Sequence, residues 1–359
     1  MDGLVAWTRN LSSGAEKVMQ LGVNAFRFHS GACDVIIVRH QDKLVSTSWH
    51  CKVANGLVGS GIETKVQLKV GNIFTDVIMK VGDDCKCYFE DHAEVFHPPA
   101  DQLQALPLKQ GCNLSELVVL QRDKGTGDWK EVASVPLGIF LWDREDKIVI
   151  ADVEGTVIKG DIWTKSADLV LLTTNKHTRG AGGLETVRDG VGPLLSYLDR
   201  AGYRVLFLTA APITRADRVR ETINWIREAE VEQWGRGAHL PASPIITTQE
   251  RMGTVLLQKL SDRTFAPFMS LGKDAGGNHQ SSFKTMSLAE LAQVFQGSSE
   301  GEEATSTFVG GFCEKVEDAV AYENAGICKE KIFVLDRAGR VKCHSPELTE
   351  YLWTSYVEM

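Results

Sequence analysis

The first pattern along the chain is a stripe of apolar residues at steps of three and four, the spacing of one face of an α-helix. It consists of Leu4, Trp7, Leu11, Ala15, Val18 and Gly22. We expect residues 1–28 to form an amphipathic helix. This helix either docks on its own domain or lies on a membrane surface, with aromatic and aliphatic side chains in the interface. In the second case the membrane-binding residues are Leu4, Trp7, Leu11 and Val18.

From residue 33 the apolar positions alternate with a period of two, which is typical of half-buried strands. Turns rich in Gly, Asn and Asp separate the runs, so the spacing predicts a small antiparallel sandwich. His97-Pro98-Pro99 interrupts the pattern, because proline fixes φ and lacks a main-chain donor. Two strands beyond this linker, 116–121 and 135–142, are placed to complete the sandwich. The strands expected before the linker are 34–39, 44–49, 64–70, 74–80 and 86–90.

After residue 147 buried apolar runs alternate with helical periodicity. The runs are 147–151, 204–208, 307–312 and 331–335, and the helices are 193–201, 216–230, 288–295 and 316–324. This alternation predicts an α/β domain with a doubly wound parallel sheet, which binds ligands beyond the carboxyl ends of its strands. The chain thus divides into a helix (1–28), a β domain (29–97), a linker with completing strands (98–146) and an α/β domain (147–359).

Composition narrows the function classes. Lys and Arg number 39 against 47 Asp and Glu, a net charge of −8, which argues against nucleic acid as the main partner. The eight cysteines include no Cys-x-x-Cys, so they indicate reduced thiols and neither a disulfide framework nor a zinc site. No apolar run approaches the roughly 20 residues that span a bilayer, and the start does not look like a secretory signal. We expect a soluble, cytosolic protein.

The strongest chemical signal is Asp152-Val-Glu-Gly-Thr156, at the end of the first α/β strand. Two acids two positions apart at a strand tip suit phosphoryl transfer. Asp152 can attack phosphorus and share a hard cation, while Glu154 can protonate the leaving alkoxide and then deprotonate a water. Gly155 permits the sharp turn, and Thr156 offers a hydroxyl to the phosphate. The plainer alternative is an ordinary β-turn.

Three later elements would have to converge on that motif. Thr209 follows the strand 204–208, where its hydroxyl and the amide of Ala210 can hold a phosphoryl oxygen. Lys284 precedes the helix 288–295 and can supply a fixed positive charge. Two more acids follow the strand that ends at residue 312, four positions apart, and can complete the oxygen shell of a cation. The residues expected at the cation are Asp152, Glu154, Glu314 and Asp318.

In this order the motifs resemble those of the lipin/Pah phosphatidate phosphatases, members of the haloacid dehalogenase superfamily. The superfamily's Asp-x-Asp-Gly-Thr motif corresponds to Asp152 through Thr156, and Phe283-Lys284 is similar to its third motif. Leu106-Pro-Leu-Lys-Gln-Gly-Cys-Asn113 resembles the segment that precedes the catalytic domain of lipins. Gly31-Ala-Cys-Asp-Val-Ile-Ile-Val-Arg39 resembles their amino-terminal domain. The resemblance is to a compact form, with the two conserved regions joined by a short stretch.

This resemblance implies a haloacid-dehalogenase-like (Rossmannoid) sheet beside an all-β immunoglobulin-like sandwich, built from the amino-terminal region and the segment before the catalytic domain. It also implies a Mg²⁺-dependent enzyme that hydrolyses phosphatidic acid in membranes to diacylglycerol, through an aspartyl-phosphate on Asp152. The family pattern would place Mg²⁺ at Asp152, the main-chain carbonyl of Glu154, and Glu314 or Asp318. Such a protein is cytoplasmic and associates peripherally with the endoplasmic reticulum membrane.

Three departures from the family pattern leave other functions open. Glu154 stands where the family has Asp, and a misplacement of about 1 Å can cost on the order of a hundredfold in rate. Thr209-Ala-Ala replaces Ser-Ala-Arg, so an arginine charge is absent, and Glu314 stands in an Asn position. The alternative is a catalytically weakened or inactive module that binds phosphatidate at membranes. A third hypothesis is a phosphatase of soluble small molecules.

Overall fold

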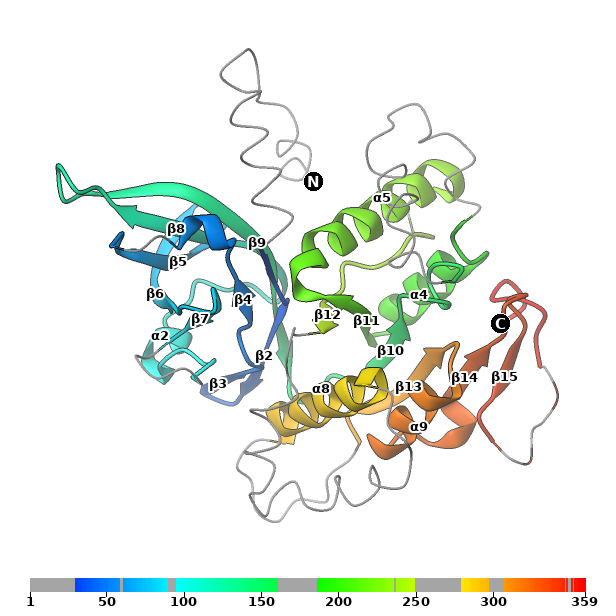
Figure 1. Cartoon of the computed structure of the whole chain (residues 1–359). Coiled ribbons are helices and arrows are strands. Elements are labelled where there is room, and N and C mark those ends of the chain that lie inside the picture. The colour runs from blue at the N-terminus through cyan, green and yellow to red at the C-terminus, as the bar shows by residue number, and fades with distance from the viewer. Residues whose placement is uncertain are drawn as a thin grey trace.

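The computed structural model describes residues 30–58, 61–89, 95–160, 186–235, 237–248, 279–296, 306–345, 347, 350 and 352–359. The predicted helix 1–28 lies outside these residues. Figure 1 shows two sheets side by side, one from the amino-terminal and one from the carboxyl-terminal part of the chain. Among the described helices, none is both long and apolar enough to cross a membrane.

The carboxyl-terminal sheet has six strands in the order β12-β11-β10-β13-β14-β15. All neighbours run parallel except β15, which is antiparallel to β14. The sequence does not predict β12 and β15, because each is too short to establish a period. The bounds are β10 (Ile148–Asp152), β11 (Arg204–Pro212), β12 (Ile245–Thr248), β13 (Phe308–Cys313), β14 (Ile332–Leu335) and β15 (Val341–Cys343).

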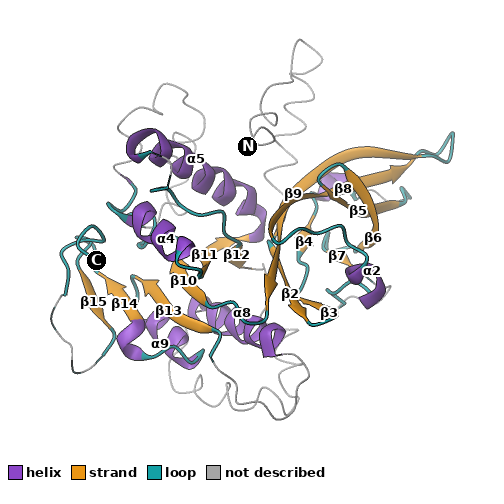
Figure 2. Ribbon diagram, turned by 180° about the vertical axis from the view of Figure 1, so that it is seen from behind, coloured by secondary structure: helices purple, strands orange, loops and turns teal. Residues whose placement is uncertain are grey.

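Four helices cover the two faces of this sheet: α4 (Val191–Arg200), α5 (Ala216–Trp234), α8 (His279–Gln296) and α9 (Val316–Asn324). Figure 2 shows α4 and α5 on one side of the sheet and α8 and α9 on the other. The side chains of β10 alternate between the two layers. Val149 and Ala151 pack towards α4 and α5, whereas Ile148 and Ile150 pack towards α8 and α9. Burial on both faces explains why β10 is apolar without a break.

The amino-terminal sheet has seven strands in the order β3-β2-β9-β8-β5-β6-β7. β2 pairs with β9 in parallel, and the other neighbouring pairs are antiparallel. The expectation of a wholly antiparallel arrangement is wrong for this pair, because strand direction is set by a partner far along the chain. The bounds are β2 (Val35–His40), β3 (Lys43–Ser46), β5 (Thr64–Val70), β6 (Ile73–Val81), β7 (Cys87–Tyr88), β8 (Gly111–Arg122) and β9 (Trp129–Asp143).

This sheet encloses a core of its own, in which Leu68, Met79 and Ile139 are fully buried. A two-stranded sheet of β1 (Gly31–Ala32) and β4 (Cys51–Lys52) contributes Ala32 and Cys51 to that core. The remaining short elements are the helix α2 (Ala100–Gln104) and the 3₁₀ turns η2 (Asn55–Leu57), η4 (Ile213–Arg215) and η5 (Lys329–Lys331).

A third apolar cluster joins the two sheets. Ile36 of β2 and Trp142 of β9 pack together with Ile150 of β10 and with α8. The rings of Trp142 and Phe295 lie 6.3 Å apart, which places α8 against the end of β9. Strands β2 and β9 of the amino-terminal sheet therefore pack against the α/β sheet and share an apolar core with it.

Candidate active site

The acidic motif lies at the carboxyl end of the central strand. Asp152 is the last residue of β10 and is 2% exposed, and β11 and β13 run parallel to it on either side. The carboxyl ends of the three strands therefore bring the residues around Thr209 and Glu314 to the same edge. This is the edge at which open α/β sheets bind ligands.

Lys284 connects the first acid of the motif with an acid from α9. Its Nζ lies 2.7 Å from Oδ2 of Asp152 and 2.7 Å from Oδ2 of Asp318. All three side chains are buried. The sequence places Lys284 before a helix, and this is wrong: α8 begins at His279, so Lys284 lies within it. The first turn of α8 is polar, so an apolar helical period does not reveal where this helix begins.

Tyr322 is a contact that the sequence does not assign. Its hydroxyl donates a hydrogen bond of 2.5 Å to Oδ1 of Asp152, and its ring is fully buried on α9. Gly311 on β13 makes room for that ring, since a Cβ there would lie 2.6 Å from Cδ2 of Tyr322. Both oxygens of Asp152 thus have a donor, one from α8 and one from α9.

The electrostatics of this cluster keep the lysine charged. Burial opposes the ammonium of Lys284, but the carboxylates of Asp152 and Asp318 outweigh it and raise its pKa. Burial raises the pKa of Asp152, against the attraction of Lys284. Burial also raises the pKa of Tyr322, so its hydroxyl stays a donor. The ammonium of Lys284 therefore contacts two carboxylates. Its charge favours the ionised form of Asp152, which is the form that can act as a nucleophile.

The second acid of the motif is held by the end of β11. Oε1 of Glu154 accepts a hydrogen bond of 2.5 Å from the Thr209 hydroxyl, and Oε2 accepts one of 3.3 Å from the amide of Ala210. Burial raises the pKa of Glu154, against these donors. Thr209 lies inside β11 and not after it, because this strand continues to Pro212. The two residues expected to bind phosphate therefore contact Glu154 here.

The turn after the motif is tight and covered. Gly155 has a left-handed φ of 76°, and its amide donates a hydrogen bond of 2.7 Å to the carbonyl of Ile158. A Cβ at this position would collide with the side chain of Glu314, so only glycine fits. The side chain of Thr156 is fully buried, on the side of Tyr356.

Glu314 contacts a different residue from those that the other expected cation ligands contact. Asp152 and Asp318 face Lys284, whereas Oε1 of Glu314 lies 3.8 Å from a guanidinium nitrogen of Arg188. Arg188 also donates from Nε to the carbonyl of Gly155 at 3.0 Å. No motif in the sequence marks Arg188, which precedes α4 and reaches the turn only through the fold.

Within the described ranges, no three acidic, histidine or cysteine side chains gather closely enough to hold a metal ion. Mg²⁺ needs fewer, since it binds through one or two carboxylates, several waters and the phosphate of a substrate. The buried carboxylates of Asp152 and Asp318 are oxygen donors of the kind that this ion prefers. The point that both carboxylates face is occupied by the ammonium of Lys284, 2.7 Å from each, so a cation would have to bind beside this ammonium.

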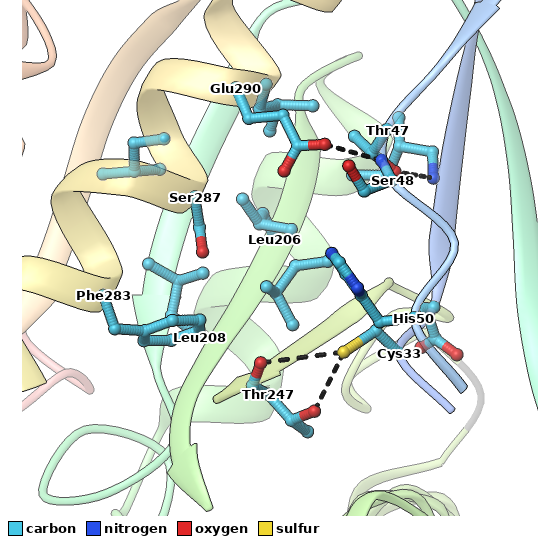
Figure 3. Close-up of a pocket in the computed structure, with 15 residues that line it drawn as sticks. Cys33, Thr47, Ser48, His50, Leu206, Leu208, Thr247, Phe283, Ser287 and Glu290 are labelled. Atoms are coloured by element: carbon cyan, nitrogen blue, oxygen red, sulfur yellow. Dashed lines mark hydrogen bonds between the residues drawn. The ribbon is translucent and has the colours of Figure 1, made fainter. Parts of the chain in front are cut away.

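A cavity of about 30 Å³ lies between the two sheets, beside this site (Figure 3). Cys33, His50 and Thr247 line one side, and Phe283 and Ser287 of α8 line the other. Burial lowers the pKa of His50 to about 3, so this ring is neutral. The volume suffices for about two water molecules and not for a lipid. The cavity is part of the junction between the sheets.

The predicted membrane-binding residues Leu4, Trp7, Leu11 and Val18 lie outside the described residues. Their role stays a prediction.

The chain is similar in sequence to known protein families. The family model described as LNS2 (Lipin/Ned1/Smp2) matches residues 94–359, which is more than half of the chain. The chain belongs to this lipin family. A second model, the lipin N-terminal conserved region, matches residues 10–106. Together the two models cover both sheets of this lipin-family chain.

Several curated relatives carry names of one activity. Phosphatidic acid phosphohydrolase 1 of Saccharomyces cerevisiae is 27% identical over 72% of this chain and 25% of its own length. Phosphatidate phosphatase PAH1 of Arabidopsis thaliana is 26% identical over 68% of this chain and 22% of its own length. Phosphatidate phosphatase LPIN1 of Homo sapiens is 23% identical over 67% of this chain and 22% of its own length. The aligned part of the chain thus spans about a quarter of these lipin-family relatives.

Proposed function

We propose that the protein is a phosphatidate phosphatase, which hydrolyses phosphatidic acid to diacylglycerol and phosphate. The observation that carries the proposal is the position of Asp152, a buried acid at a strand tip whose carboxylate is held by Lys284 and Tyr322. The names of three relatives support the substrate, since they are those of phosphatidate phosphatases or a phosphatidic acid phosphohydrolase.

The residues at the strand ends divide the reaction into two displacements. The carboxylate of Asp152 attacks phosphorus and forms an aspartyl-phosphate, while the bond from phosphorus to the glycerol oxygen breaks. Glu154 donates its proton to that oxygen, and diacylglycerol leaves. Its carboxylate then takes a proton from a water, which attacks phosphorus and releases phosphate and free Asp152. The raised pKa of Glu154 suits the donor role.

Lys284 and the turn would bind the phosphoryl oxygens. The ammonium of Lys284 offers fixed positive charge beside the attacking carboxylate. Gly155 and Thr156 form the turn over which the phosphate would lie, and the Thr209 hydroxyl and Ala210 amide are donors on the neighbouring strand β11, at the same edge of the sheet. The Thr209 hydroxyl has one proton, which it donates to Glu154 here. To donate a hydrogen bond to the phosphate, it would have to turn away from Glu154.

Mg²⁺ is the cofactor of this proposal. Asp152, the main-chain carbonyl of Glu154, and Asp318 or Glu314 would hold it. When bound, the ion would neutralise charge on the phosphate. The support is the chemistry of the donor set, since the buried carboxylates of Asp152 and Asp318 are held close together by Lys284.

The proposal also includes the fold class of each sheet. We assign the six-stranded sheet to the haloacid-dehalogenase-like class and the seven-stranded sheet to an immunoglobulin-like sandwich. The boundaries would be 29–97 and 98–146 for the β part and 147–359 for the catalytic domain. The pairing of β8 with β5 and of β9 with β2 supports this, because it joins strands from both sides of residue 98. With residues 1–28 as a membrane-binding helix, the protein would be cytoplasmic and peripheral to the endoplasmic reticulum membrane.

The contacts of Glu154 favour a second candidate function, the binding of phosphatidate without hydrolysis. The longer acid is bonded to both Thr209 and Ala210, and such contacts could also serve a module that binds phosphatidate without turnover. Phosphate release from phosphatidate in mixed micelles with Mg²⁺ decides between the two. The enzyme releases phosphate in proportion to time and protein. A module binds phosphatidate vesicles and releases no phosphate, and that result would replace our proposal.

A further inference from the structure

Arg188 donates hydrogen bonds to main-chain carbonyls both of the turn after Asp152 and of the loop between β14 and β15. Its guanidinium, 4% exposed, donates from Nε to the carbonyl of Gly155 at 3.0 Å, and from its two terminal nitrogens to the carbonyls of Arg337 at 3.0 Å and Asp336 at 3.1 Å. Its own amide donates to the carbonyl of Val157 at 3.0 Å. One buried side chain thus connects the turn after Asp152 to the loop between β14 and β15.

Glu314 contacts the same turn and also faces Arg188. Its side chain lies over Gly155, where a Cβ would collide with it, and its Oε1 is 3.8 Å from Arg188. A buried guanidinium without a nearby negative charge is costly, and Glu314 is the carboxylate that faces it among the described residues. The turn at Gly155 is therefore in contact with both an arginine and a glutamate.

We propose that Arg188 is a positioning residue for phosphoryl transfer, and that Glu314 is its counter-ion and not a ligand of Mg²⁺. This inference rests on the proposed function and narrows it, because Asp318 is then the α9 acid at the cation. Arg188 and Glu314 together fix the turn at Gly155, which carries Glu154 on one side and Thr156 on the other. Neither side chain touches the substrate in this account.

The physical reason is the geometry of the turn. Gly155 has a left-handed φ, and its carbonyl is fixed by the Nε of Arg188. If this contact is lost, the carbonyl can rotate, and Glu154 moves with it relative to Asp152. A shift of about 1 Å in reacting groups can cost on the order of a hundredfold in rate. Substrate binding depends less on this, since Lys284 is on α8 and contacts neither Arg188 nor Gly155 through any bond described above.

The test compares Arg188→Lys with Arg340→Lys in the full chain. Lysine keeps the charge but cannot donate to three carbonyls at once. Arg340 also holds the loop between β14 and β15, through the carboxylate of Asp336 at 2.8 Å, but on its exposed side. The readouts are amide hydrogen exchange of residues 153–158, thermal unfolding, and kcat and KM for phosphatidate in mixed micelles.

We expect Arg188→Lys to lose exchange protection at 155–158 and to lower kcat on the order of tenfold to a hundredfold, with a much smaller change in KM. Arg340→Lys should match the wild type in all of these. Unchanged protection and kcat in Arg188→Lys would overturn the proposal. Equal effects in Arg340→Lys would overturn it too, because the loop and not Gly155 would then be the cause.

Glu314→Gln gives an independent arm, and it carries the test if Arg188→Lys does not fold. We expect lower protection at 155–158 and an unchanged Mg²⁺ concentration for half-maximal activity, whereas Asp318→Asn raises that concentration. A rise in Glu314→Gln as large as in Asp318→Asn would show that Glu314 is a ligand and would refute the assignment. If the wild-type protein releases no phosphate, the proposed function fails, and the exchange data alone then decide whether the turn is held by Arg188.

Discussion

Arg220 on α5 and Asp34, the residue before β2, form a buried ion pair that joins the two sheets. Nε of Arg220 lies 2.8 Å from Oδ1 of Asp34. The same carboxylate accepts hydrogen bonds from the amide of Gly138 on β9 at 2.7 Å and from the amide of Ile245 on β12 at 2.8 Å. Since η4 connects the end of β11 to α5, this pair also fixes the segment that follows Thr209.

Asp34→Asn should therefore destabilise the whole chain. It removes one of the two carboxylates that Arg220 contacts, the other being Asp217 at 2.9 Å, and breaking a buried pair costs up to about 3–5 kcal/mol. Glu63→Gln is the matched control, because Glu63 pairs with Arg122 at 3.0 Å on the exposed surface and such pairs contribute at most about 1 kcal/mol. Urea unfolding measures both free energies. Equal losses in the two variants would show that the buried pair does not stabilise the junction.

Tyr322→Phe should reduce turnover without unfolding the protein. The variant keeps the ring that fills the space over Gly311 and removes the hydroxyl that fixes Oδ1 of Asp152. A hydrogen bond to a charged group contributes about 1.5–3 kcal/mol, so kcat should fall on the order of tenfold to a hundredfold. Tyr88→Phe, which removes a hydrogen bond of 2.8 Å to Asp84 far from the site, is the control. A wild-type kcat in Tyr322→Phe would contradict the role.

Glu154→Asp, although it restores the acid typical of the family, should lower activity here. The shorter side chain cannot reach both the Thr209 hydroxyl and the Ala210 amide from the same main-chain position. The acid would then lose its fixed orientation towards the leaving oxygen, and we expect a fall in kcat on the order of tenfold or more. A rise in kcat would mean that Glu154 is misplaced and that these contacts do not help the reaction.

Glu230 on α5 should make stability depend on pH. Burial raises the pKa of its carboxyl to about 7, against the amides of Leu240 and Gly192. Because the folded pKa lies above the unfolded one, its contribution is fully present below about pH 4.5 and is lost as the pH rises through 7. Relative to Glu230→Gln, the wild type should lose about 3 kcal/mol between pH 4 and pH 8. Urea unfolding at both pH values measures this, and a constant difference between the two proteins would contradict it.

The elements that the sequence predicts well are those in which a local period decides the structure. The strand 64–70 and the helix 316–324 coincide with β5 and α9, because turn residues or a strand end bound a clear alternation or stripe. The parallel pairing of β2 with β9 is different, since it depends on a partner far along the chain. The same holds for β15, which exists through its pairing with β14.

The candidate site divides in the same way. Asp152 and Glu154 are visible in the sequence because they follow a buried strand as a motif. The sequence predicts that Lys284 converges on this motif but places it before a helix, since the first turns of α8 are polar. Arg188 carries no motif, and the sequence gives Tyr322 no role. Only the fold brings their side chains to Gly155 and Asp152. Contacts of this kind need the three-dimensional structure.

The central claim is that the carboxylate of Asp152 attacks the phosphate of phosphatidic acid. The direct test is the rate of phosphate release from phosphatidate in mixed micelles with Mg²⁺, for the wild type, Asp152→Asn and Asp189→Asn. Asp189 is the control, because it lies near the same turn with its side chain 80% exposed. The account predicts release by the wild type and by Asp189→Asn and background release by Asp152→Asn. Equal release by all three proteins would contradict it.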